Sequence, residues 1–250
     1  MKKQKVKINR LLGLVMFASL IIMSGCQHSL NVKNIDEYSY IRSAPLKKNL
    51  SIGLMTQAND GHCEVLAEGI SNSLIRYSSD IRVLNSFSNA NEVDIIADVS
   101  ITPNYKGSGW NFLINFPGFL VFAPAWNGYI YKVSYDINVQ LINSSNLETV
   151  DSFDLPIDLD IRHADLNRTW TNGAGWLIDY GASAFVGGLF FTQYDKSVSP
   201  LLMNDLKVTV ASHVAQKIVD RVNRSRKLIQ FTKFHAGNSS TAFADFKMGH

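Results

Sequence analysis

The clearest pattern in the chain is an alternation of apolar and polar residues over 131–141 and again over 153–161. In the first run Tyr131 and Val133 fall on one face, and polar residues stand between and after them. Residues 143–146 read Asn-Ser-Ser-Asn, which is typical of a turn. Alternation with one polar face predicts two antiparallel strands joined as a hairpin.

Two other stretches have the period of an α-helix. Apolar residues recur at about every fourth position over 66–77, and an Asn-Asp-Gly sequence at 59–61 supplies turn and cap residues before them. A longer run with the same period follows Ser199 and Pro200, which are typical of a cap and a first helical position. We therefore expect a short amphipathic helix and a long terminal helix of about 25 residues that covers the sheet.

Shorter apolar or alternating runs predict further strands at 50–54, 81–84 and 93–101. Together with the hairpin and the helices they predict an α+β fold. We expect a mixed, largely antiparallel sheet with helices packed on it, which is an α/β sandwich. We assign 50–228 to one such domain. Residues 229–250, which are mostly small or polar with scattered Phe, are assigned to a flexible tail.

The N-terminus has the pattern of an export signal. Residues 1–10 hold five basic residues and no acid, and Leu11 to Met23 is an unbroken apolar run of 13 residues. As a helix this run rises about 20 Å, against about 30 Å of hydrocarbon core, which is short for a permanent membrane span. A basic start, a short apolar core and small residues before Cys26 predict a cleaved signal peptide over residues 1–25.

The run Met23-Ser24-Gly25-Cys26 resembles the lipobox of bacterial lipoprotein precursors, in which leucine is more usual at the first position. The resemblance implies a diacylglycerol thioether on Cys26, cleavage before it and acylation of the new amine, which hold a protein stably at a membrane. Gln27 in place of Asp implies sorting to the outer membrane of a Gram-negative cell. The polar stretch 26–49 is then predicted to be a linker to a periplasmic body. The alternative is an ordinary signal peptide followed by a cysteine.

Charge and cysteine content narrow the function classes. The signal holds five of the 24 basic residues, which leaves 19 basic against 21 acidic residues, so the basic character of the whole chain is no argument for nucleic-acid binding. With Cys26 acylated, Cys63 has no disulfide partner and is expected as a small apolar residue at a helix start, with a nucleophile as the alternative. No Cys/His cluster has metal spacing and no glycine-rich phosphate loop follows a strand, so we predict no metal and no cofactor.

Two aromatic segments have no simple place in this fold. Residues 110–126 read WNFLINFPGFLVFAPAW, which is too aromatic for a loop and too broken by Asn, Gly and Pro for a spanning helix. Residues 176–191 read WLIDYGASAFVGGLFF, where small residues four apart allow close helix packing. Each segment is either buried core or a surface that meets the membrane or a partner subunit. The residues predicted for such a contact are Trp110, Phe112, Phe116, Phe119, Phe122, Trp126, Trp176, Phe185, Phe190 and Phe191.

The densest polar run, 161–170, contains His163 and Asp165. Such a pair can form a general base or part of a catalytic triad. No serine lies in a nucleophile-elbow sequence, and the structural alternative is a hydrogen-bonded loop between the hairpin and the next helix. We therefore name no catalytic residue.

The lipobox and the order of elements resemble outer-membrane lipoproteins of polysaccharide or curli export, whose periplasmic body is a small α/β sandwich. The resemblance implies a non-enzymatic accessory of an export or assembly complex, which forms homo-oligomers or docks on an envelope protein complex through the two apolar segments. Two alternatives stay open. One is a periplasmic module that binds a lipid or glycolipid, and the other is a hydrolase of envelope polymers that uses His163 and Asp165.

Overall fold

The computed structural model describes residues 28–39, 46, 50–58, 60–77, 80–115, 128–165, 189 and 192–225. The helices and strands in this part of the chain are β1 (His28–Val32), η1 (Ile35–Tyr38), β2 (Ile52–Ala58), α2 (Gly61–Leu74), β3 (Ile81–Val83), η2 (Phe87–Glu92), β4 (Ile95–Gly107), α3 (Trp110–Asn115), β5 (Tyr129–Asn143), β6 (Thr149–Asp165) and α7 (Val198–Arg224). The two η elements are 3-10 helices.

Within these described residues the strands form one six-stranded sheet in the order β1-β6-β5-β4-β2-β3. β2 pairs in parallel with both β3 and β4. β5 leads into β6 through a short turn, in which the Asn143 N–H donates to the Glu148 carbonyl oxygen at 2.9 Å. The sheet is therefore mixed, and the predicted α+β fold with helices on the sheet is confirmed.

The chain divides into two compact units. Unit 1 comprises Met1–Asn31, Lys106–Tyr131 and Ile161–Asp195, and unit 2 comprises Val32–Tyr105, Lys132–Asp160 and Lys196–His250. Strands β4, β5 and β6 each contribute residues to both units. The single domain assigned above to 50–228 stays a prediction.

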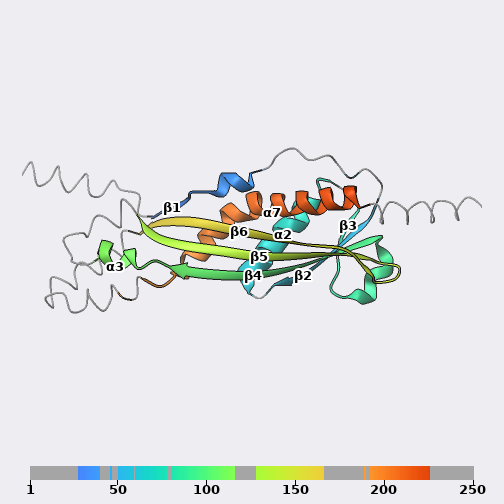
Figure 1. Ribbon diagram of the computed structural model, residues 1–250, viewed down its shortest axis with the longest axis horizontal. Helices are drawn as coiled ribbons and strands as arrows, with labels where there is room; N and C mark the ends of the chain where they lie inside the picture. Colours follow the sequence, from blue (N-terminus) through green and yellow to red (C-terminus); the bar gives the residue numbers. More distant parts are fainter. Residues whose placement is uncertain are drawn as a thin grey trace, which may run out of the picture. The chain divides into compact units, whose positions relative to one another are not determined.

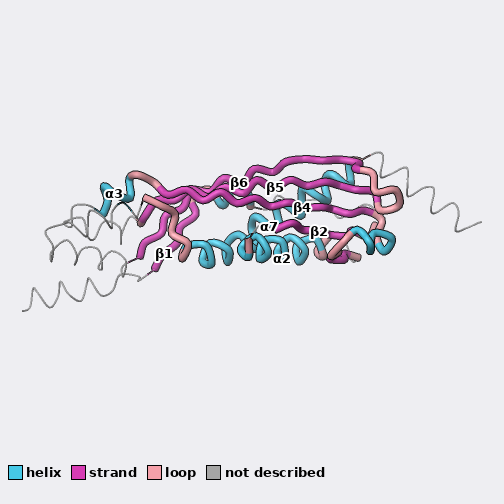
Figure 2. Tube along the Cα trace, turned by 90° about the horizontal axis from the view of Figure 1, so that it is seen from below, coloured by secondary structure: helices cyan, strands magenta, loops and turns pink. Residues whose placement is uncertain are grey.

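In unit 2, α2 and α7 lie side by side against one face of the sheet (Figure 1), and Figure 2 shows them as a layer beneath the strands. The strand β5 alternates as its sequence predicts. Val133, Tyr135 and Ile137 are at most 1% exposed, whereas Lys132 and Asp136 are exposed. Full burial of one such apolar side chain contributes about 1.5–3 kcal/mol, so the covered face of β5 is a substantial part of the core.

The helix α2 begins after the predicted cap residue, Asp60. The Cys63 N–H donates to Asp60 Oδ1 at 2.7 Å, and the Tyr105 hydroxyl donates to Oδ2 at 3.4 Å. Burial by itself raises the pKa of Asp60, but the hydrogen bonds from Cys63 and the nearby His62 outweigh it and hold this pKa below 3.8. Cys63 is fully buried, as predicted for a small apolar residue at a helix start.

The long terminal helix is also present, and it begins slightly earlier than its sequence predicts. α7 starts at Val198, so Ser199 lies inside the helix and Pro200 occupies its third position. Proline fits there because the N–H groups of a first helical turn have no intrahelical acceptor. Arg221 and Arg224 in the last turn complement the negative end of the helix dipole.

A glycine allows α2 and α7 to approach closely. A Cβ atom on Gly69 would lie 2.7 Å from the Lys207 carbonyl oxygen and 3.0 Å from the Ala211 Cβ. One turn further along α2, Ser73 Oγ lies 3.3 Å from Ser212 Oγ. The two helices are therefore in direct backbone contact over this turn.

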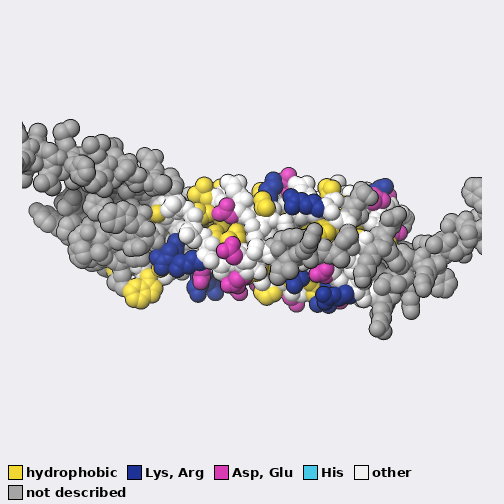
Figure 3. Space-filling model, turned by 90° about the horizontal axis from the view of Figure 1, so that it is seen from above, with side chains coloured by type: hydrophobic (Ala, Val, Ile, Leu, Met, Phe, Trp, Pro, Cys, Tyr) yellow, Lys and Arg dark blue, Asp and Glu magenta, His cyan; other side chains and the backbone are white. Residues whose placement is uncertain are grey.

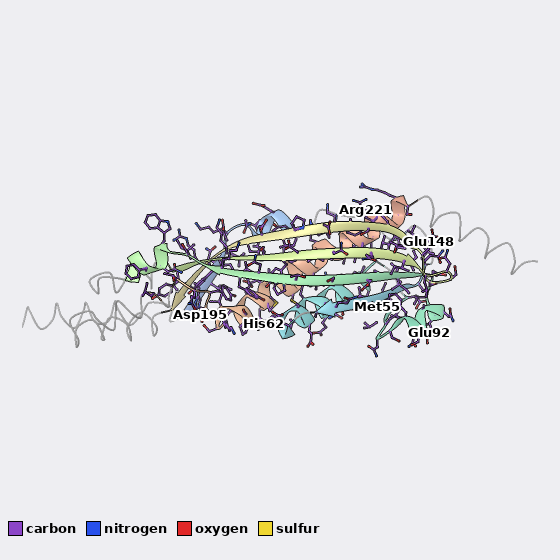
Figure 4. All side chains as sticks on the ribbon, turned by 60° about the horizontal axis from the view of Figure 1, so that its bottom comes forward. Met55, His62, Glu92, Glu148, Asp195 and Arg221 are labelled. Carbon is purple, nitrogen blue, oxygen red and sulfur yellow. The ribbon has the colours of Figure 1, made fainter. Side chains whose placement is uncertain are left out.

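A second, smaller hydrophobic cluster lies beside η2. It consists of the buried residues Leu84, Ala90, Val93, Ile96 and Ile142, with Met55 packed against them. Gly53 lies under this cluster, since a Cβ atom there would collide with the Leu84 side chain. Figure 4 shows Met55 on β2, and Glu92 of η2 at the same end of the sheet as Glu148 of the β5–β6 turn.

Part of the predicted linker 26–49 is structured, because it contains β1 and η1. Asn34 Oδ1 accepts a hydrogen bond from the Asp160 N–H at 3.0 Å. Tyr38 Oη accepts one from the Asp158 N–H at 2.9 Å. The chain after β1 therefore continues along the edge of β6 through side-chain contacts.

Acidic and basic side chains are interspersed on the face that Figure 3 shows. Lys132 Nζ lies 3.9 Å from Asp160, and Arg221 lies 3.7 Å from Asp151 with its guanidinium 5.1 Å from the centre of the Phe153 ring. Exposed ion pairs contribute about 0–1 kcal/mol each, so the fold depends on packing more than on these pairs.

Candidate functional site

Both apolar segments leave the sheet at the same end. The first connects the end of β4 to the start of β5, and the second connects the end of β6 to α7. Because β5 and β6 form one hairpin, the end of β6 lies beside the start of β5. Unit 1 contains both 110–126 and 176–191. It also contains the N-terminal residues, and therefore the predicted acylation site Cys26.

Two of the residues predicted to contact a membrane or partner are among those the structure describes. Trp110 opens α3 with 65% of its surface exposed, and Phe112 is half-buried. Leu189, in the second segment, is 52% exposed. Cys26 lies outside the described residues, as do Phe116, Phe119, Phe122, Trp126, Trp176, Phe185, Phe190 and Phe191.

A buried asparagine closes the base of the first segment. Asn111 is fully buried, and its Nδ2 donates to the Ile130 carbonyl oxygen at 2.9 Å. The Ile130 N–H donates back to Asn111 Oδ1 at 2.7 Å. The amide thus satisfies both backbone groups of Ile130, as a neighbouring strand would. We call this pair of hydrogen bonds the Asn111 clamp. It joins the two ends of the segment and fixes the backbone next to Trp110.

The sequence interpretation misses this role for Asn111, because it treats an asparagine in an apolar run only as a feature that breaks a spanning helix. One signal does point to the role, namely the position of Asn111 directly after Trp110 and a few residues after the end of β4. A polar side chain in an apolar run must find hydrogen-bond partners when it is buried.

The second segment returns to the same end of the sheet. Gly107, the last residue of β4, approaches the Thr192 backbone so closely that a Cβ atom would collide with its carbonyl oxygen. The Tyr131 and Tyr194 rings meet edge to face, with centroids 5.4 Å apart. The Thr192 hydroxyl donates to the Leu189 carbonyl oxygen at 2.6 Å. The bases of both segments are therefore anchored on the ends of β4 and β5.

Unit 1 combines an exposed aromatic ring with a nearby cation. Lys106 is exposed on β4, four residues before Trp110. Tryptophan and lysine are both favoured at the boundary between a bilayer and water, where the indole ring and the ammonium group each keep a polar contact. Both residue types are thus present and exposed near the end of β4.

Of the candidate catalytic pair, the structure describes the side chain of His163 only. His163 is 1% exposed, and the backbone of its strand packs against Gly128, whose φ is +74°. The predicted loop is wrong for residues 163–165, which extend β6 to Asp165, because His163 continues the covered face of that strand after Ile161. The side chain of Asp165 lies outside the described residues.

The described part of the chain contains no group of three or more His, Cys, Asp or Glu side chains placed to hold a metal ion. Among the described helices, none combines the length and the apolar character that crossing a membrane requires.

No family model and no curated protein matches the chain. Among solved structures, it is similar to the neuraminyllactose-binding hemagglutinin homolog from Helicobacter pylori, with a TM-score of 0.41 and 9% identity over 80% of this chain and 97% of that chain. It is also similar to a minor lipoprotein from Acinetobacter baumannii, with a TM-score of 0.34 and 10% identity over 72% and 94% of the two chains. For the PelC dodecamer from Paraburkholderia phytofirmans the TM-score is 0.31, with 11% identity over 52% and 81%. Likeness at this level assigns no function to the chain.

Proposed function

We propose that this chain is a non-enzymatic lipoprotein of the outer membrane, anchored through acylated Cys26 with its body in the periplasm. In this proposal unit 1 presents the two apolar segments to the membrane surface or to an envelope protein complex. The protein then acts as an oligomerising or docking accessory of an export or assembly complex.

The observation that carries this proposal is the short distance along the chain from Cys26 to β1. β1 begins at His28, two residues after Cys26, and two extended residues span about 7 Å. Residues up to Asn31 belong to unit 1, together with both apolar segments. An acyl group on Cys26 would therefore hold this unit directly at the lipid headgroups.

The exposed Trp110 supports the same orientation. A tryptophan that is 65% exposed is costly in water and is favoured at a membrane interface or in the centre of a protein contact. The Asn111 clamp holds the base of its segment in a fixed geometry. Unit 1 thus offers a preorganised contact surface, which lowers the entropy cost of docking.

The buried position of His163 supports the non-enzymatic part of the proposal. A general base must come within hydrogen-bond distance of the substrate proton. An imidazole that is 1% exposed on the covered face of a strand does not meet this requirement without local opening.

The first experiment tests the anchor. Metabolic labelling with radioactive palmitate should mark the wild-type protein and leave a Cys26→Ala variant unmarked. The variant should also lose its place in the outer-membrane fraction. Wild-type protein that stays unlabelled, or a variant that is processed and located like wild type, would contradict the proposal.

The second experiment tests the docking surface. Binding of protein that lacks the acyl group to phospholipid vesicles, and its oligomeric state, should be compared for wild type, Trp110→Ser and Phe87→Ser. Phe87 is a matched control because it is an aromatic side chain, 41% exposed, in unit 2. Loss of one interfacial tryptophan should weaken binding about tenfold, whereas the control should bind as wild type does. The docking role would be refuted by a wild-type protein that stays monomeric and does not bind vesicles.

A further inference from the structure

A pocket of about 420 Å³ lies in unit 2 between the C-terminal end of α2 and the middle of α7. Its described lining residues are Ser39, Ser73, Arg76, Tyr77, Val208, Thr209 and Ser212. The volume is within the range of about 300–1,000 Å³ that is typical of small-molecule sites. None of the described lining residues belongs to the apolar segments of the proposed docking surface.

Hydroxyl groups dominate the polar lining. Five of the seven lining residues carry one, on serine, threonine or tyrosine. Ser73 is 4% exposed, and its Oγ lies 3.3 Å from Ser212 Oγ. A hydroxyl donates one hydrogen bond and accepts two, so this pair keeps acceptor capacity after the two oxygens bond to each other. Such a lining matches a ligand that itself carries several hydroxyl groups.

One guanidinium supplies the only formal charge among the described lining residues. Arg76 is exposed, and no acidic side chain in the described part of the chain pairs with it. By contrast, Arg82 contacts Asp80 at 3.4 Å and Glu92 at 3.0 Å. An arginine without an acidic neighbour keeps its paired N–H donors available for a carboxylate or phosphate.

The pocket also has an apolar wall. Val208 is 62% exposed although it lies in the middle of α7, and Tyr77 is half-buried beside it. A sugar ring has polar edges and an apolar C–H face, and aromatic and aliphatic side chains commonly cover such a face in binding sites. Hydroxyls, an apolar wall and one cation are therefore present together.

We propose that this pocket binds a small sugar that carries one carboxylate or phosphate group. The hydroxyls of Ser73, Thr209 and Ser212 hold the edge of the ring, and Val208 covers its apolar face. The Arg76 guanidinium holds the anionic group through a bidentate contact.

Calorimetric titration of the purified full-length mature protein tests the proposal with four probes: glucuronate, glucose 1-phosphate, glucose and inorganic phosphate. Saturable binding of glucuronate or of glucose 1-phosphate, at least tenfold tighter than that of glucose, is the expected result. The better of these two probes identifies the anionic group. If inorganic phosphate binds as tightly as glucose 1-phosphate, the pocket recognises an anion and not a sugar, and the proposal is overturned. The proposal is also overturned if none of the four probes binds.

Arg76→Gln should weaken binding of the charged sugar at least tenfold and leave the weak binding of glucose unchanged. Arg82→Gln is the matched control, because it removes an exposed arginine of unit 2 away from the pocket, and it should bind as wild type does. Both positions are exposed, so circular dichroism should show the same fold for both variants. Equal affinity in Arg76→Gln and Arg82→Gln would overturn the proposal.

Discussion

Adding one methyl group at Gly69 should test the contact between α2 and α7. A Cβ atom there would lie 2.7 Å from the Lys207 carbonyl oxygen, which belongs to a helix backbone and cannot rotate away. Overpacking of this kind costs about 1–3 kcal/mol. Replacing glycine by alanine in a helix also stabilises that helix by about 1 kcal/mol, because alanine has the higher helix propensity. Gly69→Ala should therefore destabilise the protein by up to about 2 kcal/mol in spite of its better propensity.

Gly61→Ala provides the matched control. Gly61 is the first residue of the same helix, and a Cβ atom there would meet no other atom within 4 Å. This variant should be neutral or slightly stabilised. The difference between the two variants isolates the overpacking cost and should be about 1–3 kcal/mol, or roughly 2–10 °C in Tm for a chain of this size.

Urea denaturation followed by far-UV circular dichroism measures both free energies of unfolding. A Gly69→Val variant should be destabilised further, because two more methyl groups meet the same carbonyl oxygen. The close approach of the helices would be refuted if Gly69→Ala were as stable as Gly61→Ala.

Three further outcomes are expected. Asn111→Leu should destabilise the protein by about 1–3 kcal/mol in urea denaturation, because it leaves the partly buried N–H and carbonyl of Ile130 without the partners seen here. Burial, assisted by the charge of Lys217, lowers the pKa of His213 below 6.5, so the unfolded chain binds this proton more readily than the folded protein. Stability should therefore fall as the pH falls from 6.5 through the lower folded-state pKa, and His213→Gln should flatten this part of the curve. Asn34→Ala should raise the rate of trypsin cleavage after Lys33 about tenfold, measured by mass spectrometry, because it removes the contacts that hold this stretch on β6.

The regular elements are predictable from the sequence because each buries one face with a simple period. The alternation that begins at Tyr131 gives β5, and the recurrence of apolar residues at every fourth position gives α7. Asp60 marks the start of α2 because a carboxylate before a helix accepts from its free N–H groups.

The edge of the sheet is not predictable by the same means. Residues 28–39 are mostly polar, and the alternation of Leu30 and Val32 with polar neighbours is too short to stand out, which is why their sequence predicts a linker. β1 is held by its place beside β6 in the sheet. The residues after it are held by hydrogen bonds that the β6 backbone donates to the side chains of Asn34 and Tyr38, which lie more than 100 residues away along the chain. No local pattern encodes such a pairing, since its partner is chosen by the tertiary fold. The hydrogen bonds between Asn111 and Ile130 join residues only 19 apart, and the sequence shows only that a buried asparagine needs partners, not which ones.

The position of β1 changes what acylation of Cys26 would achieve. A flexible linker of about twenty residues would let the body move roughly 25 Å from the membrane, so contacts with lipid or a partner would form and break freely. With β1 starting at His28 the free reach falls to about 7 Å, and β1 is itself a strand of the sheet. A surface held at so short a distance has a high effective concentration at the membrane. Side chains such as Trp110, which would bind lipid weakly from solution, then suffice to orient the body. In the proposed function the anchor therefore supplies the affinity, and the apolar surface of unit 1 supplies the orientation.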